Sequence, residues 1–395
     1  MTDLVLSDVR PWGAAPVDVL VTDGRIEAVV PGGSGAPARE RLDGAGLLAL
    51  PGFVNAHAHV DKSWWGRRWV SYGGEATTQG RIAHERAERD ALGIPSVDST
   101  VAVLRELLRH GTTAVRTHVD VDLGVGLCGI EVVREAAAAL DGAVEVELVA
   151  FPQDGVVRRP GVLEFLDRAA ADGVASIGGL DPASIDRDPV AQLDGLVDIA
   201  VRRGVGLDLH VHDGGELGGF TYDLLLDRVR RAGLQGRITV SHGFALGELP
   251  PARQERLLDE LAELDVAWTT VAPVRSAPLP WAGMRSRGVG LGLGTDGIRD
   301  LWSPFGDGDL LRVALDFARL YGLRTDGDLT AAVELATSGG ARFVHRDVHD
   351  LVPGARADVV LLDAENAPDA LVRAPRRSLV LAGGRTVVRD GELVL

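Results

Sequence analysis

The residues with the clearest chemical potential lie in one short segment, residues 51–63 (PGFVNAHAHVDKS). An apolar run leads there into His57-Ala58-His59. Side chains alternate between the two faces of a β-strand, so His57 and His59 are expected to point the same way. Two imidazoles on one face at the end of a buried strand make half of a metal site. The structural alternative is a buried histidine pair whose ring nitrogens are satisfied by hydrogen bonds.

Lys62 follows this pair and is the only lysine of the chain, so the other 40 of the 41 basic residues are arginine. A lysine kept beside two histidines suggests that a compact ammonium group is needed there. We therefore predict that Lys62 serves the active site, either by donating a hydrogen bond to a ring carbonyl or by assisting a leaving group. The alternative is an ordinary salt bridge with Asp61 or Glu75.

Further groups that could bind a metal or carry protons stand in three later segments, GLDLHVHDGGE, TVSHGFALG and LGLGTDGIRD. The candidates are His210, His212, Asp213, Glu216, His242 and Asp296. His210 and His212 share a strand face, as the first pair does. Histidine and carboxylate ligands without thiolate suit a catalytic divalent metal with an open position, typically zinc or iron(II). Arg299 and Asp300 are expected only to pair with each other.

Apolar, strand-like runs alternate with helical patterns through the middle of the chain. Eight such runs end near His59, Asp120, Gln153, Asp181, His212, His242, Ala272 and Asp296. Their Val, Leu, Ile and Ala content is typical of parallel strands buried on both faces. Eight strand–helix units over about 250 residues predict a TIM-like (β/α)8 barrel, an α/β fold. Active sites in this fold lie at the C-terminal ends of the strands, where the chemical residues fall.

Both ends of the chain carry short strands separated by glycine turns. The segment VDVLVTDGRIEAVV alternates around Asp23-Gly24, which is typical of a β-hairpin. The C-terminal segment shows a similar pattern. We therefore predict a small β-sandwich domain built from residues 1–50 and 347–395, with the metal-dependent barrel occupying residues 51–346.

The connection after the first barrel strand, residues 64–95, is long for a strand-to-helix loop. It holds four aromatic residues: Trp64, Trp65, Trp69 and Tyr72. We predict a lid over the barrel mouth that is helical from about Thr78. The alternative is an oligomer interface, because exposed aromatic residues suit either role.

The composition limits the classes of partner that the protein is expected to bind. A net charge of −16 argues against binding to nucleic acid and to anionic membrane surfaces. Cys128 is the only cysteine, so internal disulfides and thiolate zinc clusters are excluded. The first residues lack a secretory pattern and no stretch is apolar enough to span a bilayer. We expect a cytoplasmic protein with a small-molecule substrate, and a homo-oligomer remains open.

These motifs together resemble the amidohydrolase superfamily, through HAHVD on the first strand, histidines on the fifth and sixth, and TDG on the eighth. Its members carry a metal at the mouth of a distorted (β/α)8 barrel and a β-domain from both termini. VRTHVDVD (115–122) and LVAFPQDG (148–155) are similar to the cytosine deaminase branch. HVDKS (59–63) and HVHD (210–213) are more similar to the isopropylammelide hydrolases, which act on N-alkylamino triazines.

The resemblance implies a role for each matching residue. The implied metal ligands are His57, His59, His210 and Asp296. His242 would orient the metal-bound water and accept its proton with the help of Asp296. Asp213 or Glu216 would protonate the ring nitrogen, Gln153 would hydrogen-bond the ring amide, and Trp302 would line the pocket.

Two departures from the cytosine deaminase pattern bear on the substrate, and a third bears on the metal. Asp213 stands where those enzymes have a glutamate, and Gly297 stands where they have a second carboxylate. Two-metal members bridge their ions with a carboxylated lysine at the end of strand four, but that strand ends SIGGLDP here. Because the only lysine lies elsewhere, the sequence predicts one divalent metal, zinc or iron(II).

The leading interpretation is a cytosine deaminase-like aminohydrolase of a pyrimidine-like cyclic amidine. A metal-activated water would attack the ring carbon that bears the amino group. The first alternative is hydrolysis of an N-alkylamino triazine with release of an alkylamine, and the second is hydrolysis of a cyclic amide. Outside enzymology, the chain could be a metal-free barrel that acts as a scaffold.

Overall fold

The computed structural model describes residues 2–395, and a barrel of eight parallel strands forms its centre. The strands are β5 (Phe53–Ala58), β6 (Thr112–Asp120), β7 (Glu145–Phe151), β8 (Ser176–Leu180), β9 (Gly206–Val211), β10 (Ile238–His242), β11 (Ala267–Thr270) and β12 (Leu291–Leu293). They lie side by side in chain order, and a parallel bridge between Ala58 and Asp296 brings the chain after β12 back to β5. The predicted (β/α)8 barrel is therefore confirmed, with its strands at the expected places.

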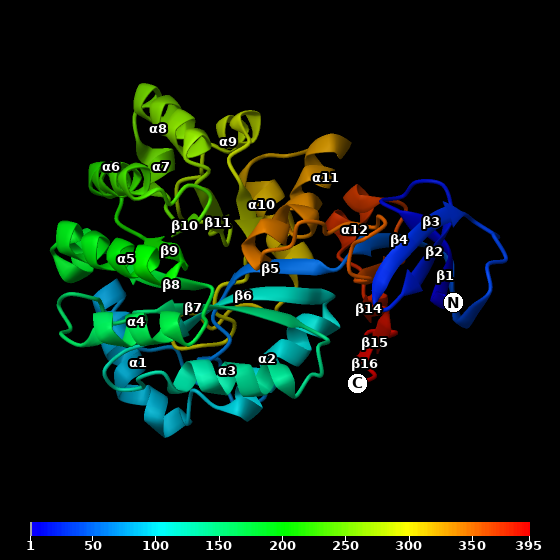
Figure 1. Cartoon of the computed structure of the whole chain (residues 1–395), viewed down its shortest axis with the longest axis horizontal. Helices are drawn as coiled ribbons and strands as arrows, with labels where there is room; N and C mark the ends of the chain where they lie inside the picture. Colours follow the sequence, from blue (N-terminus) through cyan, green and yellow to red (C-terminus); the bar gives the residue numbers. More distant parts are fainter. Residues whose placement is uncertain (1) are drawn as a thin grey trace.

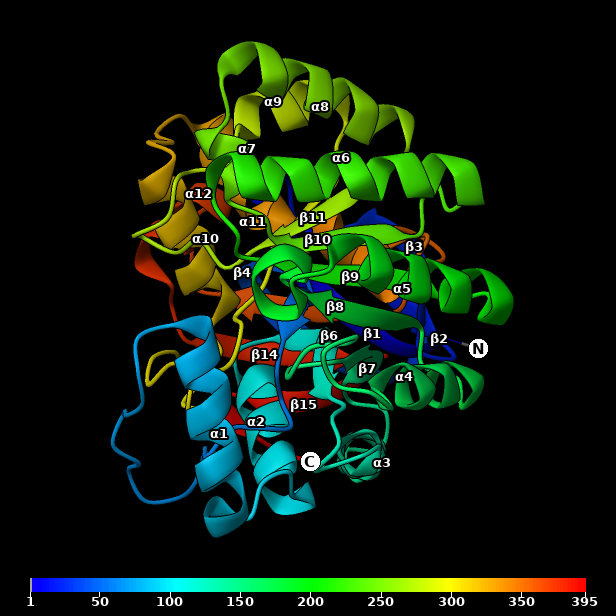
Figure 2. The ribbon, with the colours of Figure 1, turned by 90° about the vertical axis from the view of Figure 1, so that its left-hand side faces the viewer.

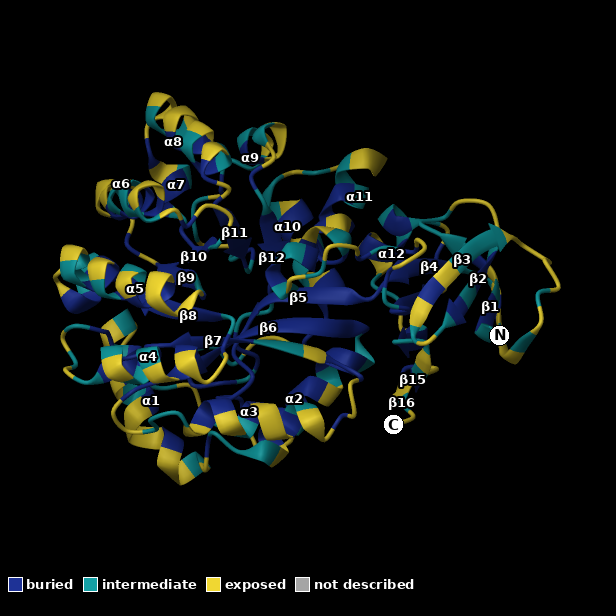
Figure 3. Cartoon of the chain, viewed as in Figure 1, coloured by how far each residue is buried: buried dark blue, intermediate teal, exposed yellow. Residues whose placement is uncertain are grey.

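Helices cover the outside of the barrel strands (Figure 2). They are α2 (Val97–Arg109), α3 (Cys128–Ala138), α4 (Val162–Ala171), α5 (Pro189–Arg203), α6 (Gly215–Ala232), α7 (Ala245–Glu248), α8 (Pro251–Glu263), α9 (Trp281–Arg287), α10 (Leu310–Leu320) and α11 (Asp326–Leu335), with a π-helical turn at Pro182–Asp186 and a 3₁₀ turn at Ser338–Val344. In Figure 3 the barrel strands are largely buried, and exposed residues lie on the outer faces of the helices. Burial of both strand faces explains why these strands read as continuous apolar runs.

Both termini contribute to one β-domain beside the barrel (Figure 1). Its strands are β1 (Thr2–Pro11), β2 (Val17–Thr22), β3 (Arg25–Pro31), β4 (Ala38–Pro51), β13 (Val359–Leu362), β14 (Arg377–Ala382), β15 (Arg385–Arg389) and β16 (Glu392–Leu393), and the short helix α12 (Ala367–Arg373) joins β13 to β14. Antiparallel pairing of β4 with β13 joins the N-terminal strands to the C-terminal ones. The β-domain built from both termini is confirmed, as is the hairpin at Asp23-Gly24. The boundaries proposed for the domains, residues 1–50 with 347–395 and residues 51–346, stay a prediction.

The long segment after β5 carries one helix, α1 (Thr78–Leu92), which begins at the residue that the sequence predicts. The Thr77 side chain accepts a hydrogen bond from the Gly80 backbone and caps this helix. Ile82 on its buried face packs against an apolar cluster at the barrel mouth, made of Phe151, Leu180, Ile185 and Trp302. The segment therefore walls one side of the mouth, which agrees with the predicted lid position.

Among residues 2–395, none of the helices has the length and apolar character that crossing a bilayer requires.

Candidate active site

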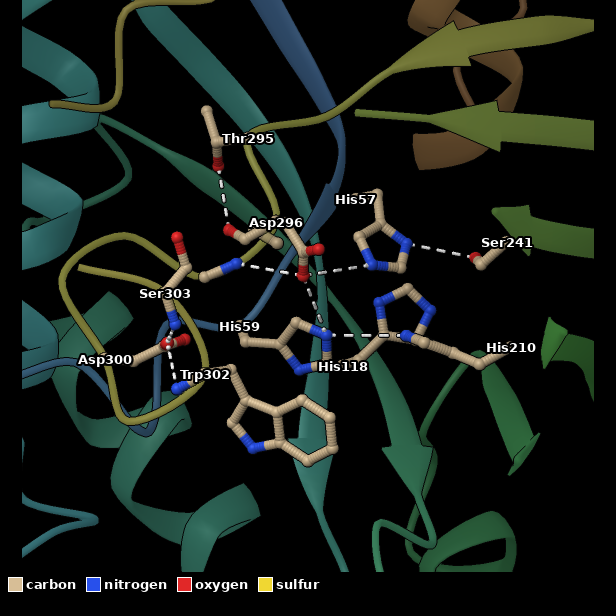
Figure 4. Close-up of polar contacts among 12 residues, drawn as sticks. His57, His59, His118, His210, Ser241, Thr295, Asp296, Asp300, Trp302 and Ser303 are labelled. Atoms are coloured by element: carbon tan, nitrogen blue, oxygen red, sulfur yellow. Dashed lines mark hydrogen bonds and ion pairs between the residues drawn. The ribbon is translucent and has the colours of Figure 1, made fainter. Parts of the chain in front are cut away.

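Histidines from several strands meet at the C-terminal end of the barrel, together with Asp296 (Figure 4). Asp296 Oδ1 lies 3.4 Å from His59 Nε2 and 3.6 Å from His57 Nε2. His210 Nε2 lies 3.4 Å from His59 Nε2. Ligand atoms about 2.1 Å from a tetrahedral metal ion are about 3.4 Å apart, so this spacing suits a metal site. Each of the four ligands that the resemblance implies thus lies within 3.6 Å of another one. The groups whose ligand atoms all lie within 4.8 Å of one another are His57, His59, His118 and His210, and His57, His242 and Asp296.

The hydrogen bonds of His57 also fit a metal ligand. Its Nε2 is buried and has no hydrogen-bond partner within residues 2–395. Its Nδ1 lies 3.0 Å from Ser241 Oγ, which donates in turn to Asp208 Oδ1 at 2.6 Å. This chain places the imidazole proton on Nδ1 and leaves the Nε2 lone pair for a cation. The orphaned nitrogen would be costly in the absence of a ligand, so the donor set fits a divalent metal.

His118 on β6 belongs to the same cluster but is absent from the sequence-based ligand set. Its ring lies 4.3 Å from that of His57, and its Nε2 lies 3.2 Å from Asp208 Oδ1. Arg116 Nε contacts the other oxygen of Asp208 at 2.9 Å. Burial lowers the pKa of His118 to about 4, although Asp208 opposes this effect. His118 is therefore neutral at pH 7, the form in which an imidazole binds a cation, and it lies with His57, His59 and His210 in one group that could hold a metal.

Charge at the ligand positions agrees with metal binding. Burial lowers the pKa of His59 and His210 well below the ordinary range, so both imidazoles are neutral. Burial acts against ionisation of Asp296, but the neighbouring imidazoles of His57 and His242 hold its pKa well below the ordinary value. Neutral imidazoles and an ionised carboxylate are the forms in which these side chains bind cations.

The ligands open onto a small cavity of about 160 Å³. The cavity is lined by His59, Lys62, Phe151, Gln153, Leu180, His210, His212, His242, Asp296, Gly297, Asp300, Trp302 and Ser303. These residues stand at the ends of barrel strands or belong to the loops that continue them. Such a cavity accommodates a single six-membered ring with small substituents.

Lys62 and Gln153 form one wall of this cavity. Lys62 Nζ donates to Asp120 Oδ1 at 2.7 Å and to Gln153 Oε1 at 2.8 Å. Because the Gln153 oxygen accepts from Lys62, its amide NH₂ is left to donate to a ligand. Burial lowers the pKa of Lys62, but Asp120, Glu85 and Asp61 outweigh it and raise the pKa overall, so the amine stays charged. The alternative considered for Lys62, a salt bridge with Asp61 or Glu75, does not form, since the close ion pair is with Asp120.

Trp302 lines the same cavity. Its indole Nε1 donates to Glu85 of α1, whose carboxylate also lies 3.7 Å from Lys62 Nζ. The Trp302 ring centroid is 5.9 Å from Lys62 Nζ. The segment that carries α1 thus contributes a carboxylate that links two residues of the cavity wall.

The two predicted proton donors are not placed at the cavity. Glu216 lies in the first turn of α6, is 71% exposed, and pairs with Arg253. Asp213 is buried but is not among the described residues that line the cavity. Its carboxylate has a raised pKa because of burial. Glu216 therefore does not fit the predicted role of proton donor to the ring nitrogen, because its side chain points away from the cavity.

His212, unlike Asp213 and Glu216, lines the cavity. Its Nδ1 lies 2.9 Å from Asp181 Oδ2. Burial lowers the pKa of His212, but Asp181 more than offsets this, so the pKa is raised. The sequence signal was present, since His212 shares a strand face with His210. Only the structure shows that Asp181, at the end of β8, completes a histidine–carboxylate pair.

His242 ends β10 with a positive φ of 66°, and its side chain lines the cavity. Burial lowers its pKa well below the ordinary value, so its neutral ring can accept a proton. Its ring lies 4.9 Å from the ring of His57 and 4.5 Å from that of His212. The position suits a base beside the metal ligands.

The expected pairing of Arg299 with Asp300 does not occur. The Arg299 guanidinium stacks on the ring of Trp64 at 4.5 Å and on that of Trp65 at 5.0 Å. Asp300 instead turns inward and accepts hydrogen bonds from its own loop. The backbone of Arg299 is in the left-handed region, with a φ of 48°.

Comparison with known proteins adds to this geometry. The model of the amidohydrolase family matches residues 91–395. The N-isopropylammelide isopropyl amidohydrolase of Pseudomonas sp. strain ADP is 28% identical over 380 residues, which cover 94% of this chain and 92% of that protein. The crystal structure of N-isopropylammelide isopropylaminohydrolase from Burkholderia multivorans is 41% identical, with a TM-score of 0.95 and full coverage of both chains. That of 5-methylcytosine deaminase from Klebsiella pneumoniae is 23% identical, with a TM-score of 0.84 over 99% of each chain, and shares the fold.

Proposed function

Because the chain belongs to the amidohydrolase family, whose members are metal-dependent hydrolases of C–N bonds, we propose that it releases an alkylamine from an N-alkylamino triazine that carries oxo groups. The observation that carries the proposal is the Lys62–Gln153 pair, which presents N–H donors to the cavity beside the metal ligands. Likeness to the two N-isopropylammelide hydrolases favours this function over the cytosine deaminase-like interpretation. Gly297, which supplies no carboxylate, points in the same direction.

We propose that one divalent metal, zinc or iron(II), is held by His57, His59, His210 and Asp296. When bound there, the ion would lower the pKa of a water molecule toward neutrality and so provide a nucleophile. The residues around the ligands handle the remaining work, which is to hold the ring and to move protons.

Each of these residues has a role that its contacts support. Lys62 and the Gln153 amide donate hydrogen bonds to ring oxygens and so orient the ring. His242, neutral and beside the ligands, accepts a proton from the attacking water together with Asp296. His212, whose pKa is raised by Asp181, donates a proton to the ring nitrogen or to the departing amine. In this scheme His212 takes the role that the sequence assigned to Asp213 or Glu216, and Trp302 covers the ring.

The test is turnover of N-isopropylammelide and of cytosine by protein loaded with zinc or with iron(II). We expect isopropylamine release from N-isopropylammelide to be far faster than ammonia release from cytosine. Metal-stripped protein is the control and should release neither product. Faster release of ammonia from cytosine would restore the cytosine deaminase-like interpretation, and no turnover of either compound would reject both.

A further inference from the structure

Asp300 is a buried carboxylate in the cavity wall that the proposed chemistry leaves without a role. It lies on the loop after β12, four residues beyond Asp296, and is 4% exposed. Its Oδ1 accepts hydrogen bonds from the backbone N–H groups of Trp302 at 2.8 Å and Ser303 at 2.7 Å. Figure 4 shows the side chain held against these two residues. One oxygen is therefore committed to the loop, and the carboxylate cannot turn freely.

The other oxygen of Asp300 is left without a donor. Within residues 2–395, no hydrogen bond reaches Oδ2 from the protein. A Cβ at Gly297 would lie 1.6 Å from Oδ2, which is far inside contact distance. Any side chain at position 297 would therefore displace the carboxylate. The glycine directly after Asp296 keeps a place for an acceptor oxygen on the cavity wall, and both residues line that cavity.

The acceptor complements the other wall in its hydrogen-bonding character. Lys62 and Gln153 present N–H donors, whereas Asp300 presents an oxygen. Burial raises the pKa of Asp300 to about 7, and the Lys62 ammonium counteracts this, so at alkaline pH the oxygen is an anionic acceptor. Water in the cavity can reach this oxygen, but a substrate that fills the cavity displaces that water, and the oxygen then loses free energy unless a substrate N–H group takes the place of the water. The cavity thus suits a ring with oxo groups on one side and an N–H group on the other.

We propose that Asp300 is a specificity-determining residue whose Oδ2 accepts a hydrogen bond from the exocyclic N–H of the amine that leaves the ring. Oδ2 lies beside the residue that follows the ligand Asp296, so it belongs to the end of the cavity where the reacting carbon meets the metal site. The amine on that carbon is the N–H group within reach. A secondary amine offers one N–H, whereas a tertiary amine offers none and leaves Oδ2 unsatisfied. The inference rests on the proposed function.

The experiment compares kcat/KM for N-isopropylammelide with that for its N,N-dialkyl counterpart. We expect the wild-type protein to prefer the secondary amine by about tenfold or more, because the tertiary amine leaves a buried acceptor unpaired. Asp300→Asn keeps the Oδ1 contacts with the loop but places an N–H₂ donor at the Oδ2 position. We expect the preference to fall toward unity, mainly through slower turnover of the secondary amine.

A second variant reaches the same oxygen without altering Asp300. Gly297→Ala places a methyl group in the space of Oδ2, and we expect it to reduce the preference as Asp300→Asn does. The φ of Gly297 is not positive, so alanine is acceptable to the backbone. Asp307→Asn, on the same loop but outside the cavity and paired with Arg312, is the matched control and should keep the wild-type preference.

The outcomes separate the inference from the proposed function. Wild-type turnover with a preference that survives in both Asp300→Asn and Gly297→Ala would overturn the inference and leave the proposed function intact. Wild-type protein that turns over neither triazine would overturn the proposed function and the inference with it. A preference lost in the two variants and kept in Asp307→Asn supports both.

Discussion

The floor and the wall of the cavity are constructed in different ways. The floor consists of ligands at strand ends, backed by fully buried residues such as Asp208 and Ser241. The wall consists of loop and helix residues, among them Lys62, Trp302 and Glu85 of α1, which are held by ion pairs and side-chain hydrogen bonds. Strand ends fix a reactive centre within a rigid barrel, while loops can vary without disturbing it. The comparison assigns reactivity to the floor and substrate choice to the wall.

The largest expected effect comes from breaking the floor. His210→Ala removes one of the four proposed ligands and leaves the cluster with three. We expect metal content to fall well below one equivalent and turnover to fall by roughly a thousandfold or more, because the nucleophile depends on the metal. Elemental analysis and amine release measure the two quantities. An active variant that retains a full equivalent of metal would show that His118 or another residue can replace His210.

Breaking the wall should leave the floor intact. Lys62→Arg puts a wide planar guanidinium where one ammonium fits between Asp120 and Gln153. We expect normal folding, an undiminished metal content and a loss of activity of roughly a hundredfold, of the size expected when buried hydrogen bonds to a substrate are lost. Wild-type turnover in this variant would mean that the solitary lysine is an accident of composition.

A milder change tests how the floor is supported. Ser241→Ala removes the group that holds His57 Nδ1 and connects it to Asp208. We expect metal affinity to fall by about tenfold to a hundredfold, as is usual when the partner of a ligating histidine is lost. Competition with a chelator measures the affinity, and activity should return at saturating metal. Activity that stays low at saturating metal would place Ser241 in the chemistry itself.

The same contrast explains what the sequence could predict. The barrel strands were predictable because buried parallel strands leave long apolar runs, and the candidate ligands stand at their ends. The choice of four ligands among those candidates came from the resemblance to the family and stays a proposal. The partner of Lys62 was not, since Asp120 is distant in sequence and meets it only through the pairing of β5 with β6. The inward turn of Asp300 was missed because it depends on the empty space at Gly297. The strand ends that carry the floor follow from periodicity, although His118 was missed there, whereas wall residues follow from loop geometry, which periodicity does not describe.

The smallest expected effect concerns the free energy of unfolding, which ionisation of the buried Asp300 carboxylate lowers. Burial raises the pKa of Asp300 to about 7, above the ordinary aspartate value of about 3.9, so the folded state binds a proton more tightly than the unfolded state does. The contribution of this group to stability is therefore full below about pH 4 and is lost as the pH rises through about 7. The Asp300→Asn side chain cannot ionise, so this variant avoids the loss.

In metal-free protein, where no cation favours the carboxylate, we expect the melting temperature of Asp300→Asn relative to wild type to rise by a few degrees between about pH 5 and pH 8. Thermal unfolding of both proteins across that range measures the difference, with Asp307→Asn, which replaces a partly exposed carboxylate paired with Arg312, as the control. A difference that is independent of pH would show that Asp300 is ionised throughout and that the wall holds its acceptor at no cost in stability.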